Sequence, residues 1–403
     1  MTAQHVSSAA GESPDDAVSK IKREEVVLVV PRDNGSGYLI YSLVEGSASD
    51  GEKPLKLEVV QCEQHQLPED LSRFLLSQGS LPPTHLSPPR EVHVVVSTHS
   101  GLKLASEFYQ GVLRPLLGSI GLEPSEARVQ GGYQATVTES SDTIRDFAQG
   151  LGRDGNATEK TVILLSGDGG VTDFLNGQDR GSPPPDNALL PTIALLPLGT
   201  GNALFHSLHK PLYATTTTTT TNPAPSPLSD TPAYRVHGAK RFAMAAGELL
   251  KVGHVYEVGV GGGEGAREVE GKGGEGGNGG KSGGGFNYVL ATLVSNLEKT
   301  FAISPESRPL DGRLRLVHFG DVGGAKTMEI MMAAYREGEH VGMPEVGYED
   351  VDEVKVTVAE EDPRWRKVCV DGSIVELEKG GWMRVGREGR ERVNILVDAA
   401  VAR

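Results

Sequence analysis

The chain has 403 residues, of which 37% are hydrophobic and only 5% aromatic, and it contains 52 glycines and 24 prolines. Its formal net charge of -15 disfavours binding to nucleic acid through a basic surface, and its two cysteines are too few for a disulfide framework or a zinc site. No apolar run reaches the about 18 residues of a membrane-spanning helix and no secretory signal opens the chain, so we expect a cytoplasmic protein.

The first 90 residues divide by composition into three parts. Residues 1–22 are small and polar, which predicts a disordered tail. The segments EEVVLVVPR, GYLIYSLV and LKLEVVQC then predict three strands, which form a small β-rich extension over residues 23–76. Residues 77–90 are rich in proline and serine and predict a linker.

From residue 91 the chain alternates between strands and helices. The runs EVHVVVS, TVILLS and PTIALLP predict buried strands, and LKLASEFYQGVLRPLLGSIG places Ala105, Val112 and Leu116 on one face of a long helix. This alternation predicts an α/β domain over residues 91–210, with a parallel sheet whose loops gather at the carboxyl ends of the strands.

The remaining residues, 211–403, predict a mainly antiparallel β-sandwich domain. Its strands are expected at GRLRLVHFG, EVKVTVA, RKVCVDGSIVEL, GWMRVG and RVNILVDA, with one helix at AKTMEIMMAAYREG. Two low-complexity inserts interrupt it, a threonine-rich one at residues 214–228 and a glycine-rich one at residues 259–285, which we expect to be flexible.

The sequence Ser-Gly-Asp-Gly-Gly at residues 166–170 follows a predicted buried strand and precedes an amphipathic stretch. We name it the first glycine loop. Glycines let the backbone approach a ligand closely, and the start of the following helix favours an anion such as phosphate. Asp168 inside such a site fits proton transfer or an indirect contact with Mg²⁺, whereas the alternative is a tight turn with a helix-capping aspartate.

The sequence Pro-Leu-Gly-Thr-Gly-Asn at residues 197–202 also lies between a strand and a helix. We name it the second glycine loop. Two such loops on strands of one sheet predict a phosphate site divided between two strand–helix units. The Walker A pattern and the protein-kinase motifs are both missing from the sequence, which excludes those two classes of nucleotide enzyme.

The stretch SGDGGVTDFLNG together with LLPLGTGNAL resembles the catalytic domain shared by diacylglycerol, ceramide and sphingosine kinases. The wider superfamily includes NAD kinase and phosphofructokinase. The segment SDTPAYRVHGAKRFAMAAGELL is similar to fungal-type sphingosine kinases, also called long-chain-base kinases. The resemblance implies an NAD kinase-like nucleotide-binding domain with a parallel sheet, followed by a β-sandwich.

The resemblance also implies ATP and Mg²⁺ as cofactors, and it suggests roles for individual residues. Asp168 matches the aspartate proposed to deprotonate the lipid hydroxyl, and Asp230 matches the acid that binds the lipid head group. The positions that match nucleotide contacts are Ser100, Gly101, Thr138, Gly167, Gly169, Gly170, Thr200, Gly201, Asn202, Arg235, Arg241 and Asp371.

The expected function is therefore an ATP-dependent lipid kinase in peripheral contact with a membrane. It acts on a sphingoid base or diacylglycerol, and the resemblance to sphingosine kinases favours the sphingoid base. Two alternatives stay open. Ser373 stands where the family's Asp-Gly-Glu motif has glutamate, and a threonine tract stands where the family has a strand, so the chain could bind nucleotide or lipid without turnover. Ceramide kinase or NAD kinase activity is the other alternative.

Overall fold

The computed structural model divides into two compact units. One consists of Met1–Leu165, Asn176–Leu195 and Val393–Ile395, and the other of Ser166–Leu175, Leu196–Arg392 and Leu396–Arg403. The residues that the structure describes are 18–32, 35–45, 55–76, 81–126, 131–153, 158–178, 189–213, 244, 248, 253–261, 268–269, 285–308, 310–371, 373–387 and 390–398.

The N-terminal part of the first unit is a three-stranded antiparallel sheet in the order β1–β2–β3. Val29 and Ile40 on its buried face pack with Leu71 of the 3₁₀ helix that follows the sheet, and β-branched and aromatic residues fill its strands as the pattern predicts. The bounds are β1 (Val26–Pro31), β2 (Gly37–Glu45) and β3 (Leu55–Glu63), followed by a 3₁₀ helix at Glu69–Phe74.

A six-stranded sheet forms the rest of the first unit, in the order β20–β8–β7–β4–β6–β5. The register pairs β4 with both β6 and β7 in parallel, which confirms the predicted parallel sheet. Every residue of β7 is buried, as expected for a central strand covered on both faces. The bounds are β4 (Glu91–Val96), β5 (Glu123–Pro124), β6 (Gly132–Val137), β7 (Lys160–Ser166), β8 (Thr192–Pro197) and β20 (Asn394–Ile395).

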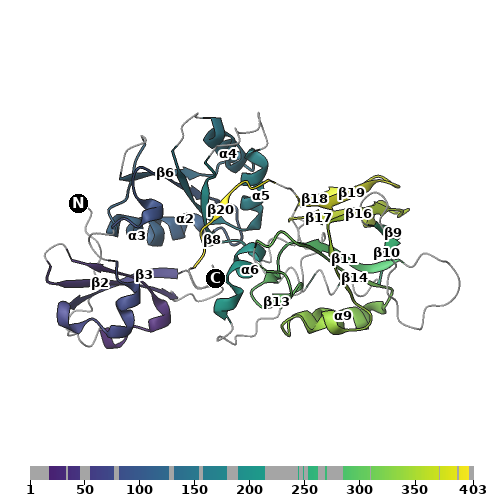
Figure 1. Ribbon diagram of the computed structural model, residues 1–403, viewed down its shortest axis with the longest axis horizontal. Helices are drawn as coiled ribbons and strands as arrows, with labels where there is room; N and C mark the ends of the chain where they lie inside the picture. The colour runs from purple at the N-terminus through teal and green to yellow at the C-terminus, as the bar shows by residue number, and fades with distance from the viewer. Residues whose placement is uncertain are drawn as a thin grey trace. The chain divides into compact units, whose positions relative to one another are not determined.

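Strand β20 comes from the C-terminal end of the chain and pairs in parallel with β8 (Figure 1). The sequence predicted a strand at this point but assigned it to the C-terminal domain. The pairing of Asn394 with Thr192 instead places it in the sheet of the first unit.

The helix predicted after β4 is interrupted by a π-helical segment, Tyr109–Leu113, between α2 (Ala105–Phe108) and α3 (Arg114–Ser119). Pro115 is the second residue of α3, and a proline ring disfavours regular helical bonding in the preceding turn. Ala105 and Val112 are buried as predicted, whereas Leu116 is only half-buried and the buried face is completed by Tyr109 and Leu117. The other helices of this region are α4 (Thr143–Arg153), α5 (Asp168–Gln178) and α6 (Ala203–Tyr213).

The second unit is rich in antiparallel strands. One sheet has the order β10–β9–β16–β19 and another the order β11–β14–β15, with two separate hairpins, β12–β13 and β17–β18. The bounds are β9 (Val258–Gly261), β10 (Glu268–Val269), β11 (Phe286–Thr292), β12 (Asn296–Glu298), β13 (Phe301–Ala302), β14 (Leu314–Gly320), β15 (Gly347–Val351), β16 (Glu353–Val358), β17 (Lys367–Val370), β18 (Ser373–Glu376) and β19 (Trp382–Gly386).

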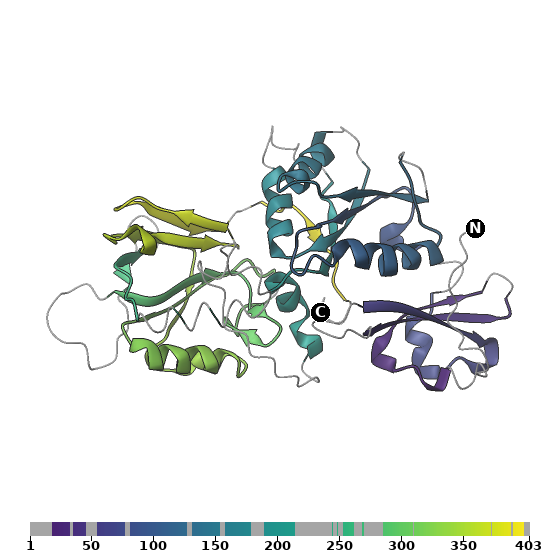
Figure 2. The ribbon, with the colours of Figure 1, turned by 180° about the vertical axis from the view of Figure 1, so that it is seen from behind.

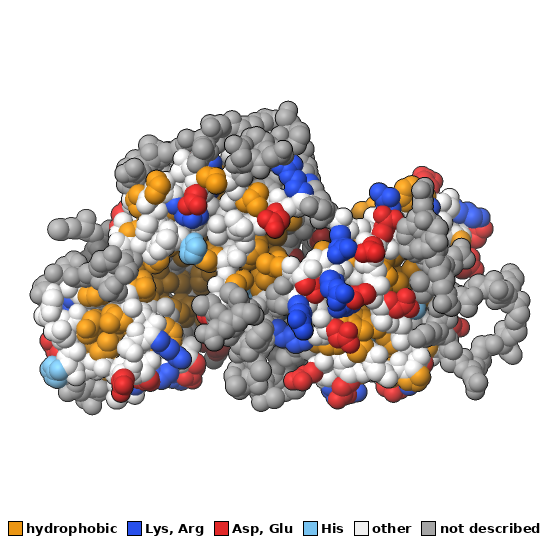
Figure 3. Space-filling view, in the orientation of Figure 1, with side chains coloured by type: hydrophobic (Ala, Val, Ile, Leu, Met, Phe, Trp, Pro, Cys, Tyr) orange, Lys and Arg blue, Asp and Glu red, His pale blue; other side chains and the backbone are white. Residues whose placement is uncertain are grey.

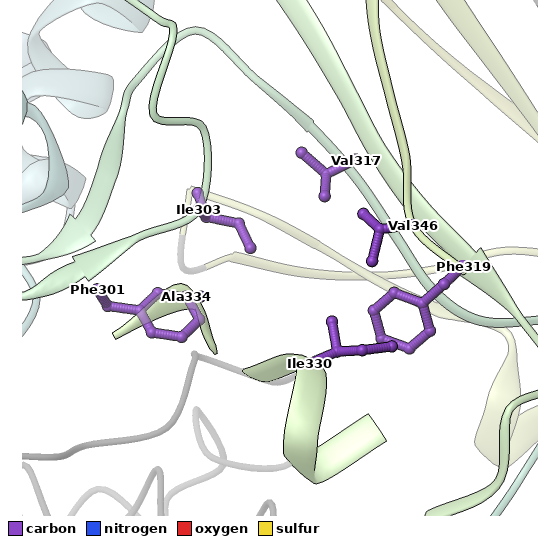
Figure 4. Close-up of a cluster of buried hydrophobic side chains, with 7 residues drawn as sticks. All are labelled: Phe301, Ile303, Val317, Phe319, Ile330, Ala334 and Val346. Atoms are coloured by element: carbon purple, nitrogen blue, oxygen red, sulfur yellow. The ribbon is translucent and has the colours of Figure 1, made fainter. Parts of the chain in front are cut away.

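Two apolar clusters form the core of this unit. One contains Val260, Leu316 and Val354 and so joins side chains of the two larger sheets. The other lies between β14 and α9 (Gly323–Ala334), and Figure 4 shows Ile330 of this helix beside Phe319. Figure 2 shows α9 from the opposite side. This helix forms where the sequence predicts one.

Part of the glycine-rich segment 259–285 has regular structure, because β9 extends to Gly261 and Glu268–Val269 forms β10. The whole of the threonine-rich insert, and residues 262–267 and 270–284 of the glycine-rich one, lie outside the described residues. Among the helices that are described, none is both long enough and apolar enough to cross a membrane.

Candidate functional site

The first glycine loop connects the end of β7 to the start of α5. Gly167 is buried between them, and Asp168 is the first residue of the helix. The backbone N–H of Gly170 donates to the carbonyl of Gly167 at 3.1 Å, which closes the first turn. The strand, glycine and helix therefore follow one another as the sequence predicts.

The second glycine loop connects β8 to α6 and is shaped by the side chain of Asn202. The Asn202 Oδ1 accepts the N–H of Gly199 at 2.9 Å, and its Nδ2 donates to the carbonyls of Gly199 and Pro197 at 2.9 and 3.2 Å. Asn202 is buried and has a left-handed backbone with φ of 54°, which asparagine tolerates better than most residues. Its amide thus holds the loop closed, and the predicted contact with phosphate stays a prediction.

The two glycine loops touch through their backbones. A Cβ atom on Gly167 would lie 2.8 Å from the Cα of Gly199, and a Cβ on Gly199 would overlap the Cα of Gly167. The N–H of Leu198 also donates to the carbonyl of Ser166 at 3.1 Å. Glycine is therefore required at both positions because no side chain fits between the loops. Gly199 was not among the predicted site residues, although its place in the Gly-Thr-Gly sequence marks it.

The carboxylate of Asp168 caps the N-terminus of α6. Its Oδ2 accepts the N–H of Ala203 at 2.7 Å, and its Oδ1 accepts the N–H of Leu204 at 2.9 Å. These are two of the helix amides that have no acceptor within the helix. The alternative role of Asp168, as a helix cap, is therefore observed. The helix that it caps is α6, after the second glycine loop, and the sequence did not predict this partner.

A second carboxylate, that of Asp371, lies near Asp168. Asp371 is the first residue of the turn between β17 and β18, where Val370 pairs with Ser373, and its φ of 45° is left-handed. An Asp-Gly pair is a strong signal for such a two-residue hairpin turn. The Thr172 hydroxyl, in the first turns of α5, donates to the carbonyl of Asp168 at 3.2 Å and acts to lower the pKa of Asp371. Sequence reasoning did not identify Thr172.

The pKa values of both carboxyl groups are raised above their ordinary range. Burial raises the pKa of Asp168, the N–H groups of Leu204 and Ala203 act in the opposite direction, and the charge of Asp371 raises it further. Asp371 is exposed by area, yet the protein around its carboxylate removes enough water to raise the pKa of Asp371, although the Thr172 hydroxyl acts to lower it. Each acid therefore binds a proton more readily than an isolated aspartate.

Helix α6 is also fixed from the other side, by β12. The Ser207 hydroxyl accepts the N–H of Asn296 at 3.0 Å, and a Cβ on Gly201 would lie 3.1 Å from the carbonyl oxygen of Leu297. His206, on the same helix, has its pKa lowered to about 4 by burial and by the nearby Lys299. This histidine is therefore neutral near pH 7.

Gly169 differs from Gly167 and Gly199 because no contact within the protein requires a glycine at this position. The residue is exposed on α5, and a Cβ there would meet no protein atom within 4 Å. Replacing Gly169 with alanine should stabilise the fold by about 0.5–1 kcal/mol, because glycine costs helix stability. If phosphate approaches this backbone, the same variant should bind nucleotide more weakly.

Thermal unfolding and calorimetric titration with ATP measure these two effects. Gly150→Ala on α4 is the matched control, since Gly150 also faces open space within a helix. The control should gain stability and keep its nucleotide affinity. Unchanged affinity in Gly169→Ala would exclude a ligand at this turn.

The loop after β4 lies in the first unit. The Thr138 Oγ1 accepts the N–H of Thr98 at 2.9 Å, and Thr98 Oγ1 donates to the Thr138 carbonyl at 3.0 Å. Ser100 bonds to Ser97 at 2.7 Å, and Gly101 has a left-handed φ of 51°. Thr138 therefore joins the ends of β4 and β6. Because β4 neighbours β7 in the sheet, this loop and the first glycine loop follow adjacent parallel strands.

Three predicted site residues, Asp230, Arg235 and Arg241, lie outside the described residues. Thr200 and Gly201 lie in the second glycine loop, between β8 and α6, and their contacts with nucleotide stay predictions. Within the described ranges, no group of three or more His, Cys, Asp or Glu side chains is arranged to hold a metal ion.

Residues 91–224 match the diacylglycerol kinase catalytic domain. The matched region begins at the first residue of β4 and contains both glycine loops. The match supports a diacylglycerol kinase catalytic domain in this part of the chain. No curated protein sequence matches the chain.

Solved structures from Bacillus anthracis str. Sterne are similar in fold. One, named provisionally as a diacylglycerol kinase, has a TM-score of 0.50 and 13% sequence identity, and the match covers 77% of this chain and 96% of the other. Another, a diacylglycerol kinase, has a TM-score of 0.44 and 12% identity, with 77% and 98% covered. At such identities the first likeness concerns the fold alone.

Proposed function

We propose that this protein is a lipid kinase that transfers the γ-phosphoryl group of ATP to a lipid hydroxyl. The observation that carries the proposal is the backbone contact between the two glycine loops, with Asp168 fixed beside it. Phosphoryl transfer depends on positioning and on neutralising charge, and glycine loops at the ends of parallel strands suit the binding of phosphates. The match to a diacylglycerol kinase catalytic domain supports the same reaction.

In this mechanism Asp168 accepts the proton of the attacking lipid hydroxyl. Each of its oxygens accepts one backbone N–H, so each keeps a second lone-pair site for the incoming proton. Its raised pKa suits a group that takes up a proton during the reaction. Ser100, Gly101 and Thr138, from the loops after β4 and β6, are proposed to contact the nucleotide.

Mg²⁺ is proposed to enter as the complex with ATP. The described residues form no set of three ligands, and Mg²⁺ at kinase sites is held largely by phosphate oxygens and water. The ion would neutralise phosphate charge, while the protein supplies backbone amides at the glycine loops. The arginines proposed to reach the phosphates are Arg235 and Arg241, and the acid proposed for the lipid head group is Asp230.

A sphingoid base is the favoured acceptor, through the resemblance of residues 229–250 to sphingosine kinases. We further propose a β-sandwich for the two larger sheets of the second unit, because side chains of both meet in one core. The enzyme would act in the cytoplasm in peripheral contact with membranes. On the face of the second unit in Figure 3, Lys and Arg are interspersed with Asp and Glu, which argues against broad electrostatic adhesion there.

Incubation with labelled ATP and a panel of sphingoid bases, diacylglycerol, ceramide and NAD tests the acceptor. The proposal expects a labelled sphingoid-base phosphate. Ser373 supports the alternative, a family member that binds its ligands without turnover. This exposed residue lies at the start of β18, next to the turn at Asp371. That alternative expects nucleotide binding by calorimetry and no labelled product from any acceptor.

The pH dependence of the reaction should report the interaction of the two carboxylates. Activity requires ionised Asp168, so kcat/KM should fall as the pH decreases through the raised pKa of this group. The charge of Asp371 raises that pKa, so Asp371→Asn should lower it and move the acidic limb to lower pH. An acidic limb that stays in place in Asp371→Asn would contradict the assignment.

A further inference from the structure

The N-terminus of α6 is capped from a distance. The first amides of a helix usually bond to the side chain of the residue directly before the helix. Here that residue is Asn202, and its amide is used within the second glycine loop. The amides of Ala203 and Leu204 are bonded instead by Asp168, which lies 35 and 36 positions earlier in the chain.

This cap joins the two glycine loops mechanically. Asp168 belongs to the first loop and to α5, whereas Ala203 and Leu204 begin the helix after the second loop. A carboxylate forms shorter and stronger bonds to N–H groups than a neutral acceptor, and its charge is favourable at a helix N-terminus. The cap and the contact between Gly167 and Gly199 therefore fix the same pair of loops at two points.

We infer that Asp168 is a positioning residue for the nucleotide as well as a proton acceptor: its carboxylate holds the second glycine loop in the geometry that binds phosphate. This inference rests on the proposed function. A positioning role predicts that nucleotide affinity decreases when Asp168 is replaced. A role in proton transfer alone does not predict this decrease.

Calorimetric titration of the full chain with Mg²⁺ and a non-hydrolysable ATP analogue tests the inference. Asparagine keeps one acceptor oxygen and alanine keeps none, so affinity should decrease from Asp168 to Asp168→Asn and further to Asp168→Ala. A tenfold loss for Asp168→Asn corresponds to about 1.4 kcal/mol. Equal affinity in all three proteins would overturn the positioning role.

The matched control is Asp311→Asn. The Asp311 carboxylate also accepts two backbone N–H groups, those of Arg313 at 2.8 Å and Arg308 at 3.3 Å, but it lies in an exposed turn before β14. Its replacement removes the same kind of interaction at a position outside the glycine loops. Nucleotide affinity should be unchanged in this control, and a loss as large as that of Asp168→Asn would overturn the inference.

Hydrogen exchange supplies a readout that does not depend on nucleotide. In Asp168→Asn the amides of Ala203 and Leu204 should exchange about tenfold faster, while the amides of β14 stay protected. Unchanged exchange at these two amides would overturn the cap. Loss of protection in β14 as well would indicate that Asp168→Asn disturbs the whole fold. In that case Asp168→Glu, which keeps the charge, should restore the protection of β14 and part of the nucleotide affinity. Failure of this rescue would contradict the inference. Absence of nucleotide binding by the unmodified chain would instead overturn the proposed function.

Discussion

Asp168→Asn is expected to reduce phosphoryl transfer to a lipid hydroxyl by about 100- to 10,000-fold at saturating ATP, the usual contribution of a positioned general base. Asparagine has nearly the shape of aspartate but cannot accept the proton. Saturating ATP separates this loss in kcat from any loss of nucleotide affinity. Initial rates with labelled ATP and a sphingoid base measure it.

The fold should survive this substitution, because the asparagine oxygen can still accept one of the two amides of α6. Thermal unfolding checks this, and Asp311→Asn should transfer phosphate at the wild-type rate. Full activity of Asp168→Asn would exclude Asp168 as the proton acceptor.

Gly199→Ala is expected to have the largest effect on the two loops themselves. The new methyl group would overlap the Gly167 backbone and lie 2.7 Å from the Asn202 Oδ1, so the second loop must move. Overpacking of this kind costs about 1–3 kcal/mol of unfolding free energy. Since the loop also loses its closing bonds to Asn202, nucleotide binding should be lost as well.

Chemical denaturation and calorimetric titration measure these two losses. Gly259→Ala in β9 is the matched control, because a Cβ at Gly259 meets no atom within 4 Å. The control should keep both its stability and its nucleotide affinity. A Gly199→Ala variant with unchanged stability would contradict the close contact between the loops.

Local sequence patterns predict much of this fold. The fully buried run at β7 and the glycines after it identify the central strand and its loop, because no polar alternation interrupts the strand. The segment RKVCVDGSIVEL, expected as a strand, forms the two strands β17 and β18, and the Asp-Gly pair that begins at residue 371 marks the turn between them, since few residue pairs adopt the left-handed backbone that it requires.

Other features depend on contacts that a local pattern does not contain. Strand β20 has the alternation of any short strand, and only its pairing with β8 assigns it to the parallel sheet. Strands β11 and β15 were not predicted, and they are defined by their bonds to β14 on either side. The π-helical segment before Pro115 is an irregularity that a 3.6-residue period cannot show.

Some features of the candidate site could likewise be predicted from the sequence, and others could not. Both glycine loops and Asp168 are visible in the sequence because each loop has more glycines than a simple turn needs, directly after a buried strand. The partner of Asp168 is not visible, because the amides of Ala203 and Leu204 carry no side-chain signal at all. The same holds for Thr172, which acts on the pKa of Asp371 although the two residues are far apart in the chain.

The most direct test of the central claim is transfer of label from γ-labelled ATP to lipid, measured with the unmodified chain and Asp168→Asn in parallel. We predict a labelled sphingoid-base phosphate from the unmodified chain and a loss of at least about 100-fold from the variant. Equal rates from the two proteins, or no labelled lipid from the unmodified chain with any acceptor of the panel, would contradict the proposed lipid kinase.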